Sequence, residues 1–132
     1  HVIFHAAGPA GNGMFTAIKD NDVALNDGSA DKVWAIGVDM DQNAMGAYKT
    51  KDGKSDNFTL TSSVKAVGTG LAKVATKGKN GNFPGGKTLT LGLEDHGVSA
   101  TTKNLNAEEK KAVEAAKQDI LDNKVSVPTT VK

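Results

Sequence analysis

The chain has 132 residues, 23% of them charged, and its formal net charge is +1 because 16 basic residues face 15 acidic ones. This length corresponds to about one domain, and no apolar stretch approaches the roughly 20 residues that cross a bilayer. The absence of cysteine excludes disulfides, thiol catalysis and zinc–thiolate sites. Every basic residue is Lys and no basic block occurs, so we expect no nucleic-acid partner.

Strands and helices alternate along the first half of the chain. An apolar run at 2–7 predicts a buried strand, and the glycine-containing loop 8–13 leads into a helix over about 14–21. The continuous apolar run at 32–39 predicts a second strand that is covered on both faces. Residues 49–57 include no apolar side chain, so we expect a surface excursion there.

The same alternation continues after this excursion. A short strand at 58–61 precedes a helix that Ser62 or Ser63 is expected to cap. The alternating segment 88–93 predicts a fourth strand, and 98–102 a short fifth.

The last helix has the clearest start signal. Asn106 stands three residues before Glu109, the spacing of a capping box. Strands that alternate with helices predict an α/β fold, a three-layer sandwich with a mainly parallel sheet, as a single domain over 1–132.

Two motif matches do not have the context that their chemistry needs. Residues 81–88 fit the phosphate-loop pattern G-x-x-x-x-G-K-[ST], but a helix precedes them and a strand is expected to follow, the reverse of a phosphate loop. We therefore expect a connection into a strand and no ATP hydrolysis. The run Asp39–Asn43 resembles a calcium loop, but Ala44 and Thr50 stand where Gly and Glu are required. No metal, cofactor or catalytic residue is expected.

The glycine loop followed by an acid at the next strand end is the layout of a dinucleotide site. Its spacing is G-x-x-G-x-G rather than G-x-G-x-x-G, and Pro9 lacks an N–H. A ribose- or sugar-binding role for the loop and Asp39 therefore stands beside a simple turn with a capping acid. Lys65 falls in the first turn of its expected helix, a poor place for a cation unless it pairs with Asp39 or a ligand. His5 is interpreted as a hydrogen-bonded core imidazole.

Four runs in order along the chain together resemble the basic membrane protein family: AAGPAGNGMF (6–15), VWAIGVDMDQ (33–42), LTSSVKAVG (60–68) and FPGGKTLTLGLEDHGV (83–98). Members of this family are surface lipoproteins that serve as substrate-binding components of ABC importers, among them purine nucleoside receptors. The resemblance implies one lobe of a type I periplasmic binding protein. This chain would be mostly the carboxyl-terminal portion, and the amino-terminal lobe and a lipid-bearing Cys would lie upstream of His1.

Carried over by position, the resemblance also implies a ligand site. Asp39 would bind the ribose hydroxyls and Lys65 the same ribose or its ring oxygen. The loop around Gly11 and Gly13 would pass its backbone beside the nucleoside, although Pro9 stands where the family more often has Gly. The aromatic residues that stack on the base would lie upstream of His1.

The resemblance therefore implies a non-catalytic binding lobe at the extracellular face of the bacterial cell membrane, with a purine nucleoside and an ABC transporter permease as partners. A fragment of a Rossmann-like enzyme that binds a nucleotide cofactor is the alternative from another class. A structural or adhesive surface fragment is the third. The glycine spacing, the missing Arg and the lack of any catalytic constellation count against the enzyme.

Overall fold

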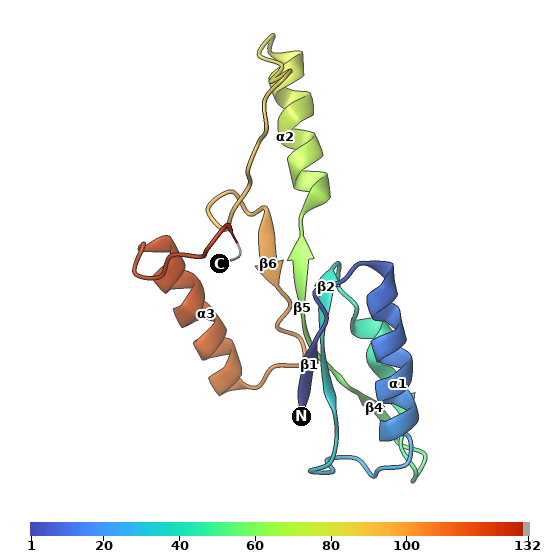
Figure 1. Cartoon of the computed structure of the whole chain (residues 1–132). Coiled ribbons are helices and arrows are strands. Elements are labelled where there is room, and N and C mark those ends of the chain that lie inside the picture. Colours follow the sequence, from blue (N-terminus) through green and yellow to red (C-terminus); the bar gives the residue numbers. More distant parts are fainter. Residues whose placement is uncertain (131–132) are drawn as a thin grey trace. The chain divides into compact units, whose positions relative to one another are not determined.

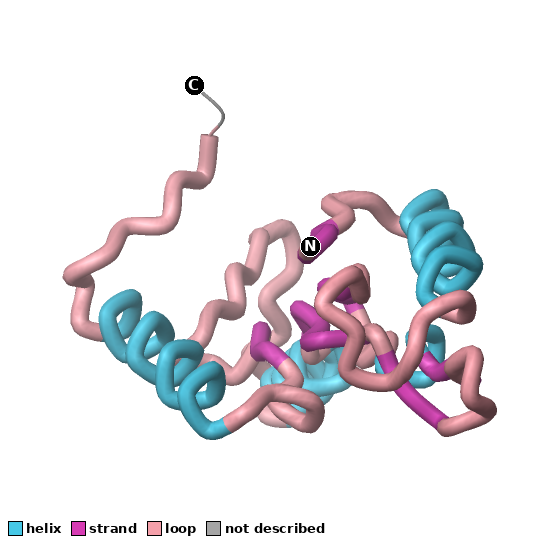
Figure 2. The backbone as a smooth tube through the Cα atoms, turned by 90° about the horizontal axis from the view of Figure 1, so that it is seen from below, coloured by secondary structure: helices cyan, strands magenta, loops and turns pink. Residues whose placement is uncertain are grey.

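The computed structural model describes residues 1–130, which form two compact units. Unit 1 comprises residues 1–64 and 100–105, and unit 2 comprises 65–99 and the described residues from 106 onwards. Figure 1 labels the elements and Figure 2 separates helices, strands and loops along the same backbone. The expected single domain over 1–132 stays a prediction.

One four-stranded sheet organises the fold. Its strands, in order of pairing, are β1 (Val2–Phe4), β2 (Trp34–Asp39), β5 (Thr59–Lys65) and β6 (Val98–Ala100). β1, β2 and β5 run parallel. β6 runs antiparallel to β5, since Thr101 donates to the carbonyl of Ser62 and Ala66 donates to that of Gly97. The α/β class and the mainly parallel sheet are confirmed, while the three-layer arrangement and the likeness to a binding-protein lobe stay predictions.

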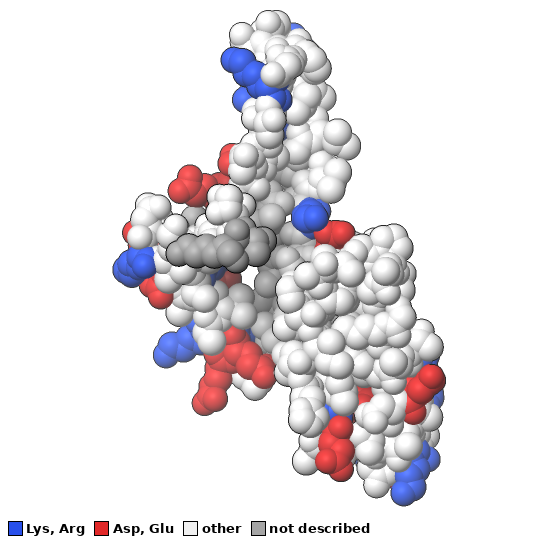
Figure 3. All heavy atoms as spheres, viewed as in Figure 1, with Lys and Arg blue, Asp and Glu red and all other residues white. Residues whose placement is uncertain are grey.

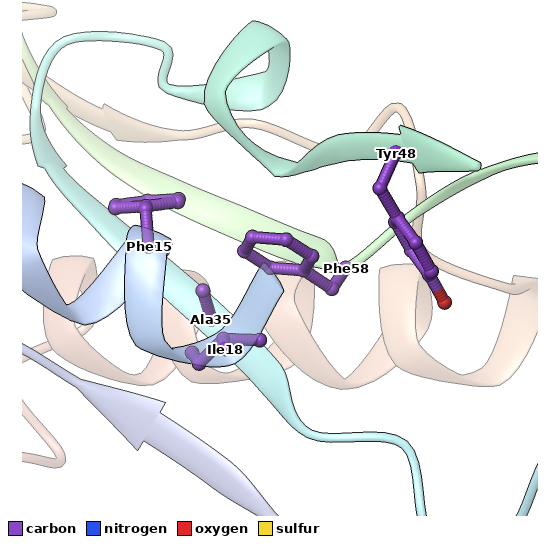
Figure 4. Packing of buried hydrophobic residues seen from close by; sticks show 5 residues of the cluster. All are labelled: Phe15, Ile18, Ala35, Tyr48 and Phe58. Atoms are coloured by element: carbon purple, nitrogen blue, oxygen red, sulfur yellow. The ribbon is translucent and has the colours of Figure 1, made fainter. Parts of the chain in front are cut away.

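The core of unit 1 lies between the sheet and helix α1 (Asn12–Asp22). Its buried apolar side chains, shown in Figure 4, are Phe15, Ile18, Ala35, Tyr48 and Phe58. Phe58 is fully buried, and its ring lies 5.9 Å from that of Phe15 and 5.8 Å from that of Tyr48. Burial of one such ring contributes about 1.5–3 kcal/mol, so this small aromatic cluster holds α1 on the sheet.

The predicted surface excursion at 49–57 is partly regular. β3 (Ala47–Lys49) and β4 (Ser55–Asn57) pair antiparallel. The turn between them includes Gly53 at φ 79°, a conformation that favours glycine. Two short 3₁₀ turns, η1 (Pro9–Gly11) and η2 (Asn43–Gly46), complete unit 1.

A buried ion pair ties the hairpin to the sheet. Lys32 is 5% exposed, and its Nζ lies 2.6 Å from Asp56 Oδ2 and 4.1 Å from the ring centroid of Trp34. Burial raises the pKa of Asp56, but hydrogen bonds from Lys32, a backbone N–H and Tyr48 outweigh it, so the net pKa lies below its usual value. Burial and the bond to Asp56 raise the pKa of Tyr48. The carboxylate of Asp56 is therefore charged at neutral pH.

The structure corrects the predicted start of the second helix. Helix α2 spans Val67–Lys79, and Ser62, Ser63 and Lys65 belong to strand β5 instead. The expected caps are thus wrong, as is the placement of Lys65 in a first helical turn. The reason is the pairing with β2, which continues to the register pair Asp39 and Val64 and keeps this segment extended.

The predicted strand at 88–93 is wrong as well. This segment is irregular and runs beside α2, where a Cβ on Gly70 would lie 3.2 Å from Leu91 Cδ1. No strand of the described residues pairs with it, so the alternating apolar and polar residues of this segment form no β-ladder. Residues 81–88 are a connection, as expected, but into this irregular segment.

The predicted burial of the first strand is wrong. Val2, Ile3 and Phe4 of β1 are 54%, 43% and 57% exposed, because β1 is an edge strand that pairs with β2 alone.

The predicted capping box is confirmed at the start of α3 (Ala107–Leu121). The N–H of Glu109 donates to Asn106 Oδ1 over 2.9 Å, and the N–H of Asn106 donates to Glu109 Oε2 over 2.7 Å.

Candidate functional site

A hollow of about 190 Å³ opens in unit 1 where β1 and β2 end. The carboxyl edge of parallel strands is the usual place for ligands in open α/β sheets. The lining residues come from the loop after β1, the start of α1 and the loop after β2: His5, Ala7, Gly8, Pro9, Asn12, Val38, Asp39, Met40 and Gln42.

Asp39 stands at the rim of this hollow as the last residue of β2. Its φ is +70°, and Met40 N–H donates to the carbonyl of Val38 over 2.9 Å. A hydrogen bond that spans one residue of positive φ defines a γ-turn of the rare, strained hand. Such strain at a non-glycine residue is concentrated at functional sites. The exposed carboxylate can accept hydrogen bonds from the hydroxyls of a ligand.

The glycine loop contributes less directly than the sequence suggested. Gly11 is buried, and a Cβ there would overlap the imidazole of His5. Gly13, in the first turn of α1, has open space where a Cβ would lie. Gly8 and Pro9 are the loop residues that line the hollow. Direct ligand contact by Gly11 and Gly13 stays a prediction.

Lys65 belongs to unit 2 and is the last residue of β5. It lines a hollow of about 560 Å³ within unit 2, together with apolar residues of α2 such as Val67 and Leu71. The register pairs Asp39 with Val64, the residue directly before Lys65. Convergence of the Asp39 and Lys65 side chains on one ligand remains a prediction.

Two residues of the hollow were missed as functional candidates from the sequence. His5 is half-buried and follows β1, with Nδ1 2.9 Å from the carbonyl of Ala7 and Nε2 3.1 Å from Gln42 Oε1. It is hydrogen-bonded, as expected, and its ring lies edge-on to the core ring of Phe15, but it is only half-buried and also lines the hollow. Gln42 is 7% exposed and bonds to several elements. The only sequence signal was its place at the end of the run that carries Asp39.

Residues 1–130 hold neither a metal-binding cluster nor a membrane-spanning helix. No cluster of three or more His, Asp or Glu side chains there could hold a metal ion. None of the helices in the same part of the chain has the length and apolar character that a membrane span requires.

The sequence of the chain that carries this site matches substrate-binding proteins of ABC transporters. Residues 1–131 match the Bmp family, described as "ABC transporter substrate-binding protein PnrA-like", and the chain belongs to this family. The predicted resemblance is thereby confirmed. Because the family consists of substrate-binding proteins and not enzymes, the prediction that the chain is not an enzyme is confirmed too.

Curated relatives agree with this assignment. The "ABC transporter nucleoside-binding protein BmpA" of Lactococcus lactis subsp. cremoris is 46% identical over 97% of this chain and 36% of its own length. The "CD4+ T-cell-stimulating antigen" of Listeria monocytogenes serovar 1/2a is 42% identical over 96% of the chain and 35% of its own length. The chain thus spans about a third of the length of these relatives.

Proposed function

We propose that this chain is the carboxyl-terminal part of a nucleoside-binding protein that delivers a purine nucleoside to an ABC transporter permease. The protein would act at the extracellular face of the bacterial membrane, anchored by lipid upstream of His1. Asp39 would accept hydrogen bonds from the ribose hydroxyls and Lys65 would donate to the same ribose. The backbone around Gly11 and Gly13 would pass beside the nucleoside.

The observation that carries this proposal is the rim position of Asp39 in a member of this family. A hollow at a strand edge with a carboxylate at its rim suits a vicinal diol, since a carboxylate can accept from both hydroxyls. The 46% identical relative bears the name of a nucleoside-binding protein.

The size of the hollow supports an incomplete site. Its volume of about 190 Å³ lies below the roughly 300–1,000 Å³ of pockets that enclose drug-sized ligands. The proposal is that the amino-terminal lobe supplies the opposite wall, with the aromatic residues that stack on the base.

Calorimetric titration of the full-length protein with inosine, adenosine, guanosine, NAD and ATP tests the function. We expect micromolar or tighter binding of at least one nucleoside and no binding of NAD or ATP. Tight binding of NAD alone would instead support the Rossmann-like alternative. Binding of none of the five would support a structural or adhesive role.

A further inference from the structure

The loop after β2 is held by one buried side chain, that of Gln42. Its Oε1 accepts the N–H of Val38 over 2.8 Å and lies 3.1 Å from His5 Nε2. On the other side of the amide, Nε2 lies 3.5 Å from Asn12 Oδ1 and 3.3 Å from Met45 Sδ. Both ends of this side-chain amide are therefore engaged.

The backbone of Gln42 is fixed to the neighbouring strand. Its N–H donates to Ser62 Oγ over 3.1 Å, and its carbonyl accepts from Thr59 Oγ1 over 3.3 Å. Ser62 is fully buried and Thr59 is 1% exposed, so these bonds are shielded from water. Gln42 is thus anchored to β5 before its side chain reaches back to β2.

The contact between Gln42 and β2 requires a glycine. A Cβ on Gly37 would lie 2.5 Å from Ser62 Oγ and 2.9 Å from both Cβ and Oε1 of Gln42, closer than real Cβ atoms come to a neighbour. The absence of a side chain at Gly37 leaves room both for the Gln42 side chain and for the Ser62 hydroxyl to which the Gln42 backbone bonds.

Asp39 lies inside the loop that this contact closes. Val38 donates to the Gln42 side chain, and its carbonyl accepts from Met40 across the strained turn at Asp39. A strained backbone persists only where surrounding contacts over-determine it. Loss of the Gln42 acceptor would leave the N–H of Val38 unpaired and release one side of that turn.

We infer that Gln42 is a positioning residue that holds the carboxylate of Asp39 toward the ligand. This inference deepens the proposed function and rests on it for its effect on binding. Gln42 acts through the backbone of residues 38–40 rather than by touching the ribose.

The test compares ligands with and without the ribose diol on the full-length protein. Gln42→Met removes the acceptor at similar size, and should weaken inosine binding by about tenfold or more, the cost of one charged hydrogen bond. Binding of 2′,3′-dideoxyinosine should not change, and the loss should vanish in an Asp39→Asn background. Gln118→Met, an exposed change on α3, is the matched control and should alter neither ligand. Equal losses for both ligands, or full additivity with Asp39→Asn, would overturn the inference.

A second measurement separates this inference from the proposed function. Amide hydrogen exchange without ligand should be faster at Met40 in Gln42→Met, while the amide of Ala35, bonded to Phe58, keeps its rate. Unchanged exchange at Met40 would refute the positioning role even if inosine binds. If wild type ignores inosine, the proposed function fails, and exchange alone decides whether Gln42 holds the turn.

A third variant covers the case in which Gln42→Met does not fold. Gln42→Glu keeps an acceptor oxygen for the N–H of Val38. It should therefore keep the preference for inosine over 2′,3′-dideoxyinosine, and the amide of Met40 should exchange as slowly as in wild type. Loss of both properties would show that the acceptor is not what positions Asp39.

Discussion

At the scale of single residues, two glycines of one loop have opposite surroundings. The ring of His5 occupies the space where a Cβ on Gly11 would lie, whereas the space beside Gly13 is open. The sequence predicted a glycine-rich loop at a strand end, and that is correct. The spacing of the glycines does not show which of them is needed for packing. The contact between Gly11 and the ring of His5 exists only in the folded chain.

Alanine substitutions should therefore move stability in opposite directions. Gly11→Ala should destabilise by about 1–3 kcal/mol, the cost of forcing an atom into a packed site. Gly13→Ala, in a helix with free space, should stabilise by about 0.4–1 kcal/mol through the entropy of the unfolded chain. Urea denaturation of both variants measures these changes. A neutral Gly11→Ala would show that the ring of His5 moves aside freely.

Asp39 and Gln42 show how far sequence reasoning reached at the site. The strand end and its acid were predicted from a local apolar run, and the structure places Asp39 at a rim. The partners of Gln42 lie 20 residues away at Ser62 and 37 away at His5. Contacts over such separations have no local signature, so this residue could not have been identified from the pattern alone.

At the scale of elements, the ion pair of Lys32 and Asp56 joins the hairpin to the sheet. Both side chains are largely buried, at 5% and 15% exposure. Asp56→Ala should destabilise by about 3–5 kcal/mol, because it leaves an uncompensated charge on buried Lys32. Thermal or urea unfolding measures the loss. Asp31→Ala, at an exposed position, is the control and should change stability by less than about 0.5 kcal/mol.

The same pair predicts a pH dependence. The folded pKa of Asp56 lies below the ordinary value of an aspartate carboxyl. A depressed carboxyl pKa adds stability above the unfolded pKa, and this stability is lost as pH falls through the folded value. The free energy of unfolding should therefore drop below about pH 4, and less steeply in Asp56→Asn. Parallel pH curves for the two proteins would contradict this source of acid sensitivity.

Strand β5 and the segment 88–93 explain the errors in the predicted elements. Ser62 and Ser63 have the local character of helix caps, but parallel pairing with Gly37 and Val38 keeps them extended. The segment 88–93 has the alternation of a strand and no pairing partner among the described strands. Periodicity reports which side chains can share a face, whereas a ladder depends on a neighbour elsewhere in the chain.

At the scale of the whole molecule, α2 presents apolar side chains that the described residues leave exposed. Val67 is 65% exposed and Leu71 67%, and no residue of α2 is buried. The face of α2 seen in Figure 3 is largely uncharged. Contiguous exposed apolar patches on soluble proteins mark association surfaces.

The isolated 132-residue chain should consequently self-associate. Leu71→Ser should reduce the associated fraction in sedimentation analysis without lowering the melting temperature, because this exposed side chain contributes little to the fold. Ala115→Ser on α3 is the control and should leave association unchanged. A monomeric wild-type chain at high concentration would contradict the prediction.

The isolated chain should also bind nucleosides weakly. Hydrogen bonds to ribose that stay exposed to water are worth roughly 0.5–1.5 kcal/mol each. Two or three of them correspond to about millimolar affinity or weaker. Calorimetry of the chain with adenosine, guanosine and inosine checks this expectation. A sub-micromolar dissociation constant would mean that the site is complete within these residues.

The central claim is that Asp39 binds the ribose diol, and its most direct test uses the full-length protein. Calorimetry should compare wild type, Asp39→Asn and the neighbouring exposed control Asp41→Asn, each with inosine and with 2′,3′-dideoxyinosine. Asp39→Asn should weaken inosine binding by about tenfold or more, from the loss of charged hydrogen bonds, and should leave 2′,3′-dideoxyinosine binding and the control unchanged. Unaltered inosine binding in Asp39→Asn, or an equal loss for both ligands, would contradict the assignment of Asp39 as the ribose-binding residue.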